Sequence, residues 1–359
     1  MNSARLNALL KNVSRSFYLT LRVLPSGVRS QVGLAYLLAR ATDTVADTEA
    51  ISVDQRLDAL RLLRERISGE SNKPLSLPLN GTGPEQRLLA DIEQVFSVFA
   101  TFLPSDQQRI RELLEIITSG QELDLVRFAK AGERNIAALN GPDELDDYTY
   151  RVAGCVGEFW TRMCRAHLFP NAVLDDKFLF ENGIRFGKGL QLVNILRDIP
   201  RDLRNGRCYV PLSELREANL QPNGLLDSAN EARFRPIYDR WLAKAESHLH
   251  AGWEYTNALP RSAARVRLAC AWPILIGLRT LKRLKVEPVL DPDRRIKVSR
   301  SEVRQIMIKS ALLYPFPALW RKQVPLECGS PGTIRPTRTD KDAFSQSEFK
   351  AVSSHRTRN

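Results

Sequence analysis

The sequence contains one stretch that sets the fold class, Gly187-Lys-Gly-Leu-Gln-Leu-Val-Asn-Ile-Leu-Arg-Asp-Ile-Pro-Arg-Asp202. Its apolar residues leave few positions that favour water, which is typical of a buried helix. Four polar residues nevertheless recur at steps of three and four, and residues at that spacing share one face of a helix. They are Gln191, Asn194, Asp198 and Asp202. Burying two carboxylates one turn apart is costly unless a cation neutralises them, so this face is either open to water or holds metal.

A second polar stripe lies far away in the chain, within residues 31–47. Its members share one face of another apolar helix, because they are spaced by four, three and four residues. They are Tyr36, Arg40, Asp43 and Asp47. One Asp-x-x-x-Asp pair arises often by chance on a solvated helix. Two such pairs on apolar helices, about 150 residues apart, favour a shared functional site.

Helical periodicity dominates the chain, and alternation with period two is scarce, which predicts an all-α fold with almost no strand. Helices are predicted over residues 5–12, 28–47, 54–67, 85–102, 105–130, 143–168, 174–203, 228–257, 261–286 and 299–318. Residues 1–322 are predicted to form one domain. From about residue 323 the composition shifts to Gly, Pro, Ser, Thr and Arg, which predicts a disordered basic tail over 323–359.

Charge and cysteine content narrow the classes of function. The formal charge is +12, which fits nucleic acid, an anionic membrane, a polyanionic substrate or simply a solvated basic surface. No nucleic-acid-binding motif supports the first of these.

An odd number of cysteines without C-x-x-C spacing favours free thiols in a reducing cytoplasm over disulfides or zinc. We find no run of about 18 apolar residues and no signal-peptide core, so no membrane span is expected.

The two aspartate stripes suit the binding of a diphosphate through magnesium. Mg²⁺ prefers oxygen ligands and takes one or two carboxylates together with phosphate oxygens. Arginine completes such a site, because guanidinium is permanently charged and matches phosphate geometry. Arg40, Arg197 and Arg207 lie near the carboxylates in sequence. Taken singly, each could equally form a surface salt bridge.

At these residues the chain resembles the squalene/phytoene synthase family, which joins two isoprenyl diphosphates head to head. Val13-Ser-Arg-Ser-Phe17 is similar to an early segment of the family, and Tyr36 through Asp47 to its first aspartate motif. Tyr150-Arg-Val-Ala-Gly-Cys-Val-Gly-Glu158 resembles its tyrosine-valine-alanine-glycine helix. Gln191 through Pro211 resembles the second aspartate motif, and Lys297-Val-Ser-Arg300 a basic segment near the last helix. The resemblance covers residues 10–310.

The resemblance implies an isoprenoid-synthase fold, a helical bundle around a central apolar cavity. It implies Mg²⁺ ligands at Asp43, Asp47, Asn194, Asp198 and Asp202. It implies diphosphate contacts at Ser14, Arg15, Arg40, Gln191, Arg197 and Arg207. Tyr36 would face the reacting centre and act in catalysis together with the four aspartates.

The implied reaction is the condensation of two farnesyl diphosphates through presqualene diphosphate to squalene, with Mg²⁺ and NADPH. The motifs look most like those of a bacterial squalene synthase, and the alternative products are phytoene and dehydrosqualene, which need no reductant. Lys297 and Arg300 would contact NADPH or lie in a solvated basic face. We expect a cytoplasmic monomer that binds no nucleic acid and could contact the membrane peripherally. The alternative from another class is a non-catalytic helical scaffold that binds nucleic acid or anionic membrane.

Two local features leave the geometry open. Pro200 lies between Asp198 and Asp202, and because proline tends to kink a helix, Asp202 could point away from the other ligands. The small residues Ala153, Gly154 and Gly157 would either leave room for a prenyl chain or allow close helix packing.

Overall fold

The computed structural model describes residues 3–13, 17–48, 50–74, 83–132 and 134–324 of the 359-residue chain. The chain divides into two units, residues 1–326 and 327–359, and every described element belongs to the first. These elements are helices and two very short strands, so the all-α prediction is confirmed. The helices are α1 (Ser3–Val13), α2 (Phe17–Val23), α3 (Ser26–Asp47), α4 (Val53–Ser68), α5 (Pro84–Ala90), α6 (Ile92–Phe99), α7 (Pro104–Arg127), α8 (Pro142–Thr149), α9 (Cys155–His167), α10 (Asp176–Arg204), α11 (Leu212–Glu217), α12 (Glu231–Ala258), α13 (Ala264–Leu284), α14 (Arg300–Leu313) and α15 (Pro317–Arg321); the strands are β1 (Ala137–Ala138) and β2 (Arg207–Cys208).

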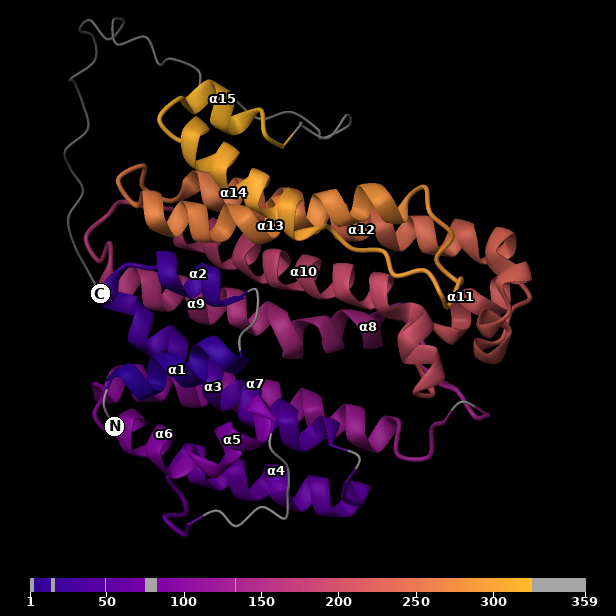
Figure 1. Cartoon of the computed structure of the whole chain (residues 1–359), viewed down its shortest axis with the longest axis horizontal. Helices are drawn as coiled ribbons and strands as arrows, with labels where there is room; N and C mark the ends of the chain where they lie inside the picture. The colour runs from indigo at the N-terminus through magenta and orange to yellow at the C-terminus, as the bar shows by residue number, and fades with distance from the viewer. Residues whose placement is uncertain (1–2, 14–16, 49, 75–82, 133, 325–359) are drawn as a thin grey trace, which may run out of the picture. The chain divides into compact units, whose positions relative to one another are not determined.

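The helices form three tiers in the described unit (Figure 1). The long helix α10 occupies the middle tier, where it packs along α12 on one side and α9 on the other. Helices α13 and α14 lie beyond α12, and α3, α4 and α7 form the tier beyond α9. One apolar core surrounds α10, α12 and α13, and a second one lies among α3, α4, α7 and α9. α3 and α10 face one another along the boundary between these two apolar cores.

Observed and predicted helices differ mainly where the chain breaks locally. The predicted helix 299–318 ends at Leu313, and Pro317 begins α15. The physical reason is that a residue before proline avoids the helical conformation, whereas proline itself suits the first helical turn. The predicted helix 85–102 is likewise two helices, which meet at Asp91. The helix α2 was not predicted.

The predicted helix 143–168 contains a π-helical turn over Tyr150–Gly154 that separates α8 from α9. Such turns insert one extra residue into a helix and are frequent at functional sites. Here the turn coincides with the tyrosine-valine-alanine-glycine segment noted in the sequence. It changes which residues of that segment face the neighbouring helices.

Close contact between α9 and α10 is made possible by glycine. A Cβ on Gly157 would lie 1.9 Å from the carbonyl oxygen of Gly183, and a Cβ on Gly187 would lie 2.1 Å from that of Ala153. Neither distance can be tolerated by a real side chain. Of the two readings of these small residues, the structure therefore supports close helix packing at Ala153 and Gly157.

A two-residue parallel sheet fixes the chain directly after α10. β1 pairs with β2 in the register Ala137 with Arg207 and Ala138 with Cys208. Gly206 precedes β2 at φ +77°, in the left-handed region, and a Cβ there would lie 2.2 Å from the backbone nitrogen of Gly132. A glycine is thus required at this turn. The turn and the sheet together set the direction of the Arg207 side chain.

Two further predictions concern the state of the cysteines and the absence of a membrane-spanning segment. The four cysteines in the described part of the chain are buried free thiols, and Cys328 lies outside it. Among the described helices, none combines the length and the apolar content that crossing a bilayer requires. The boundary at residue 323 stays a prediction, because the tail lies almost wholly beyond the described residues.

We predict that Gly157→Ala destabilises the protein by about 3 kcal/mol, because the new methyl group forces α9 away from α10. Gly27→Ala is the matched control. This glycine is also helical, but a Cβ there would meet its nearest neighbour at 3.4 Å, an ordinary contact. Its stability should be unchanged or slightly higher. Denaturant unfolding measures both variants, and equal stabilities would contradict the packing role of Gly157.

Candidate active site

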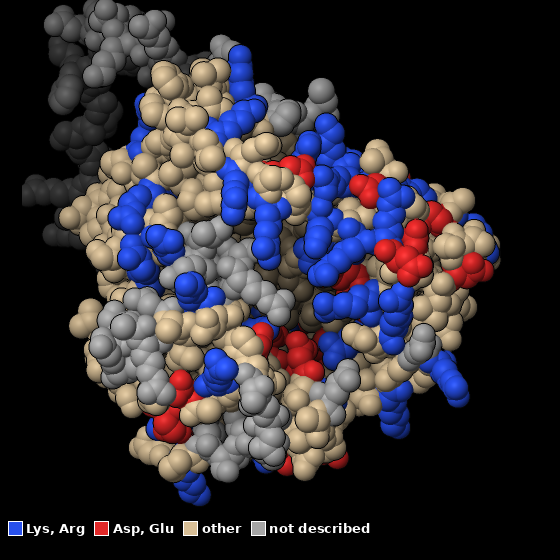
Figure 2. Space-filling view, viewed as in Figure 1, with Lys and Arg blue, Asp and Glu red and all other residues tan. Residues whose placement is uncertain are grey.

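A cavity of about 700 Å³ lies between α3, α7, α10 and the segment from Tyr148 to Val156. Figure 2 shows the hollow from outside, with acidic side chains in its depth and basic side chains around its mouth. The apolar part of the wall comes from alanine and branched aliphatic residues. They are Ala39, Ala46, Ile117, Leu125, Val152, Val156 and Ile195. The wall of the cavity therefore contains aliphatic side chains as well as carboxylates and arginines.

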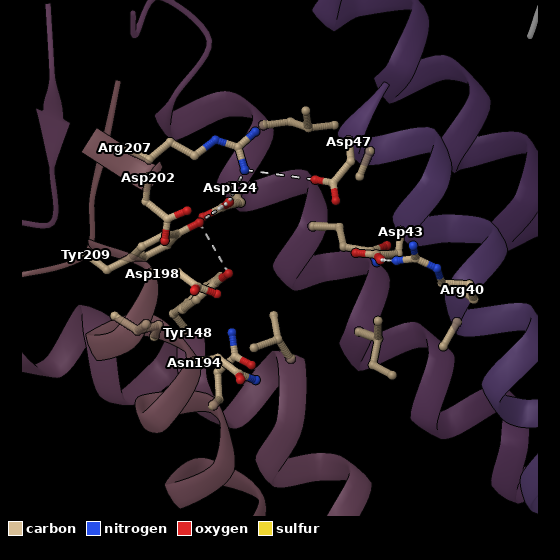
Figure 3. A pocket seen from close by; sticks show the side chains of 18 of the residues that line it. Arg40, Asp43, Asp47, Asp124, Tyr148, Asn194, Asp198, Asp202, Arg207 and Tyr209 are labelled. Atoms are coloured by element: carbon tan, nitrogen blue, oxygen red, sulfur yellow. Dashed lines mark hydrogen bonds and ion pairs between the residues drawn. The ribbon is translucent and has the colours of Figure 1, made fainter. Parts of the chain in front are cut away.

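The two aspartate stripes meet across this cavity. Asp43 and Asp47 line it from α3, whereas Asn194, Asp198 and Asp202 line it from α10. Figure 3 shows the α3 carboxylates facing the α10 side chains across open space. These elements are brought together only by the tertiary fold, since they are about 150 residues apart in sequence.

Pro200 does not remove Asp202 from the site. α10 continues through Pro200 as far as Arg204, and Asp202 lines the cavity with Asp198. The direction of Asp202, which the sequence left open, is thus toward the cavity.

Three arginines of the cavity form ion pairs with carboxylates, and two of them, Arg40 and Arg197, pair with an aspartate on their own helix. Arg40 donates to Asp43 and, at 2.9 Å, to Glu85. Arg197 makes a two-pronged contact with the neighbouring Asp198, with N–O distances of 2.6 and 2.9 Å. These guanidinium groups are half-buried, so they are part of the cavity wall and not ion pairs of the outer surface.

Arg207 contacts carboxylates on two helices of the cavity wall, α3 and α7. One of its terminal nitrogens lies 3.6 Å from an Asp124 oxygen on α7 and 4.0 Å from an Asp47 oxygen on α3 (Figure 3). Arg207 itself lies in β2, directly after α10. Its single positive charge therefore connects this segment with the carboxylates on α3 and α7.

Asp124, Tyr148 and Tyr209 belong to the site, although the sequence did not reveal them. The Tyr209 hydroxyl donates to Asp124 at 2.9 Å, and the Tyr148 hydroxyl lies 3.3 Å from that of Tyr209. The two rings are stacked, with centroids 4.8 Å apart. A signal existed for Asp124, since Gln121 and Asp124 are polar residues three apart, and both line the cavity with Ile117.

The remaining predicted residues are placed as follows. Tyr36 and Gln191 line the cavity, and the Tyr36 hydroxyl donates to the carbonyl of Val13 at 3.2 Å. Lys297 and Arg300 are exposed and do not line it. Ser14 and Arg15 lie outside the described residues.

The carboxylates carry an excess of negative charge that the arginines do not fully balance. Burial and the neighbouring Asp47 raise the pKa of Asp43 to about 6. Burial raises the pKa of Asp124 to about 6. Burial, with repulsion from Asp198, raises the pKa of Asp202 to about 7. The ionised forms are therefore disfavoured unless a cation is present.

The donor set fits Mg²⁺. All candidate ligands are oxygen atoms, and one oxygen each of Asp124 and Gln121 is buried without a hydrogen-bond partner among the described residues. In the same part of the chain, no three acidic, histidine or cysteine side chains gather closely enough to hold an ion by themselves. This is the arrangement expected where each ion takes one or two carboxylates and completes its shell with water and phosphate.

The chain is a bundle of helices around a cavity into which two aspartate-bearing helices project. The family model for squalene/phytoene synthase matches residues 10–302, so the chain belongs to the squalene/phytoene synthase family. The fold is similar to that of a solved structure, TcSQS in complex with E5700, with a TM-score of 0.72 and 22% identity over 90% of this chain and 92% of that one. The predicted isoprenoid-synthase fold is thereby confirmed.

Relatives with different products are similar to the chain. A bifunctional lycopene cyclase/phytoene synthase of Blakeslea trispora is 29% identical over 75% of this chain and 43% of its own length. The squalene synthase of Saccharomyces cerevisiae is 31% identical over 76% of this chain and 59% of its own length. The chain thus spans about half the length of the curated relatives that it matches.

We predict that without divalent cations the stability of the protein falls between about pH 4 and pH 7. A carboxyl whose pKa is raised on folding holds its proton more tightly when folded, so its contribution is present at low pH and is lost as pH rises through the folded pKa. Adding Mg²⁺ should therefore raise the melting temperature more at pH 8 than at pH 5. Asp202→Asn should flatten the pH dependence measured without Mg²⁺. If the stability of Asp202→Asn depended on pH as steeply as that of the wild type, the raised pKa of Asp202 would not contribute to the pH dependence.

Proposed function

We propose that the chain is a Mg²⁺-dependent transferase that joins two farnesyl diphosphates head to head and, with NADPH, forms squalene. The observation that carries the proposal is the meeting of two aspartate-bearing helices across one cavity, with arginines between them. A prenyl diphosphate has a polyanionic head and an apolar tail. The cavity offers both oxygen ligands with arginines and aliphatic side chains, as a binding site for such a substrate requires.

We assign the residues of the cavity to two roles, binding Mg²⁺ and binding the diphosphate. Asp43, Asp47, Asn194, Asp198 and Asp202 would hold Mg²⁺, with Asp124 beside them. Mg²⁺ held by these residues would supply positive charge that stabilises the diphosphate leaving group. Arg40, Arg197 and Arg207 each have N–H donors beyond those used in their carboxylate contacts, and these can bind phosphate oxygens. Gln191 would add a further contact to the diphosphate.

The coupling needs charge stabilisation more than a dedicated base. One farnesyl diphosphate ionises to an allylic cation, the double bond of the second attacks it, and the departed diphosphate accepts the proton that is lost as the cyclopropane closes. The second diphosphate then leaves, the skeleton rearranges, and a hydride from NADPH quenches the cation to squalene. Tyr36 lines the cavity from α3, as Arg40 and Asp43 do, and would face the cation that ionisation leaves. Aliphatic residues such as Val152 and Val156 exclude water that would otherwise trap the cations.

The choice of product rests on the sequence motifs. Tyr150 through Glu158 and Asn194 through Asp198 look most like squalene synthases, whereas the similarity to phytoene synthases supports phytoene or dehydrosqualene as the second candidate. All these products share the first type of condensation. Phytoene differs from squalene in the chain length of the substrate and in needing no reductant, whereas dehydrosqualene differs only in needing no reductant. Each product is an insoluble hydrocarbon that we expect to leave toward a membrane.

Identification of the hydrocarbon tests the product directly. Purified protein is incubated with farnesyl or geranylgeranyl diphosphate and Mg²⁺, with and without NADPH, and the extract is analysed by mass spectrometry. We expect squalene from farnesyl diphosphate only when NADPH is present. Phytoene from geranylgeranyl diphosphate would overturn the squalene assignment and support the second candidate.

Substitution of the aspartates tests the site. Asp43→Asn and Asp198→Asn should each lower Mg²⁺-dependent turnover by at least about 10²-fold with the fold intact, because each removes charge that neutralises the metal–diphosphate unit. Asp58→Asn is the control, since this aspartate lies on the exposed face of α4 in a surface ion pair with Arg61. Unchanged turnover in the first two variants would contradict the proposed role of these aspartates. No turnover by the wild type, with salt-sensitive binding to DNA or lipid that neither substitution weakens, would favour the non-catalytic scaffold.

Lys297 and Arg300 allow a separate test of the reductant site. If they contact the NADPH phosphate, Lys297→Gln with Arg300→Gln should raise KM for NADPH about tenfold. The rate of presqualene diphosphate formation without NADPH should not change. A change in neither quantity would assign both residues to a solvated basic face, in agreement with their exposure.

A further inference from the structure

Large apolar side chains are exposed together on α14 and α15. Ile308, Leu312, Phe316 and Leu319 are between 48% and 68% exposed, and they follow one another at steps of four, four and three residues. The other exposed large apolar residues of the described chain are scattered between residues 62 and 286. Single exposed apolar residues are common, but a contiguous group of them marks an interaction surface.

The opposite side of this segment is firmly anchored. Trp320 is buried, stacks on Trp253 with centroids 5.1 Å apart, and donates to Asn257 at 2.9 Å. The indole of Trp272 donates to the buried Ser310 at 3.0 Å. Ser310 of α14 and Trp320 of α15 thus fix the two helices to the fold, while the apolar stripe stays exposed.

The charge around the stripe has one sign. Residues 303–324 contain no Asp or Glu, and their basic residues are Arg304, Lys309, Arg321 and Lys322. All four are exposed, and within the described residues none of them takes part in an ion pair. The nearby Glu302 turns inward to Arg283 at 2.8 Å and caps α14 through Ser299. Figure 2 shows a broad uncharged area over α14 and α15, with Lys and Arg along its borders.

We propose that the α14–α15 face, defined by these four apolar and four basic residues, docks onto the surface of an anionic lipid bilayer. An exposed apolar stripe with a basic border binds such a surface, because the apolar side chains enter the headgroup region while the cations meet lipid phosphates.

Charge also argues against two other occupants. A second copy would bring the same four positive charges against the first. The chain from 325 to 359 carries six Lys or Arg and four Asp or Glu, so it is itself net basic. Neither is complementary to a face that lacks acidic residues.

The proposal is tested by co-sedimentation of the full chain with vesicles of phosphatidylcholine, alone or mixed with phosphatidylglycerol, without any substrate. We expect partitioning that requires phosphatidylglycerol and that weakens as salt is raised. Arg304→Gln with Lys309→Gln should weaken it about thirtyfold, since each charge near an anionic surface contributes about fivefold. Ile308→Gln with Leu312→Gln and Phe316→Gln should weaken it at least about tenfold.

Leu103→Gln with Val173→Gln is the matched control, because these residues are at least as exposed as Phe316 but lie elsewhere. Its partitioning should equal that of the wild type. Equal binding to both kinds of vesicle, or unchanged binding by the apolar-stripe variant, would overturn the proposal. So would a wild-type dimer, seen by light scattering, that the stripe variant converts to monomer, because the face would then belong to a second copy. Vesicle binding needs no turnover, so failure here and failure of the proposed reaction are distinguishable.

Discussion

The constraint on which this structure depends is the repulsion among carboxylates that face one another across a cavity. Asp43 and Asp47 on α3 confront Asp198 and Asp202 on α10, with Asp124 between the walls. The arginines reduce this repulsion but do not remove it, since burial still raises the pKa of Asp43, Asp124 and Asp202. A protein that keeps such a cluster gives up stability for a site that is complete only when cations and a polyanion bind.

The packing of the surrounding elements fixes the positions of the cavity walls that bear these carboxylates. Gly157 and Gly187 let α10 lie against the segment that contains the π-helical turn, so one wall is set by backbone contact. The turn at Gly206 and the two-residue sheet direct Arg207 toward the other two walls. Rigid packing of this kind keeps the carboxylates apart at a distance that a diphosphate with its metal ions can fill, and it prevents them from relaxing into separate surface ion pairs.

The sequence predicted the stripes on α3 and α10 because helical spacing is local information. Tyr36 and Asp43 share a face by arithmetic alone, and so do Asn194 and Asp198. The all-α class followed from the same periodicity, and the family resemblance supplied the bundle. Asp124 had only a weak signal, its spacing of three from Gln121, and Tyr209 had none, because each acquires its partner only through tertiary contact. Pro200 left the direction of Asp202 open, and α10 continues through it.

The central claim is that carboxylates from two distant helices bind diphosphate only through Mg²⁺. Calorimetric titration of the purified protein with inorganic diphosphate tests this most directly. The account predicts strong binding in the presence of Mg²⁺ and little without it, with weak binding of Mg²⁺ alone, because each ligand completes the site for the other. Equally tight binding of diphosphate with and without Mg²⁺ would contradict the account, because the arginines alone would then suffice and the aspartates would have another role.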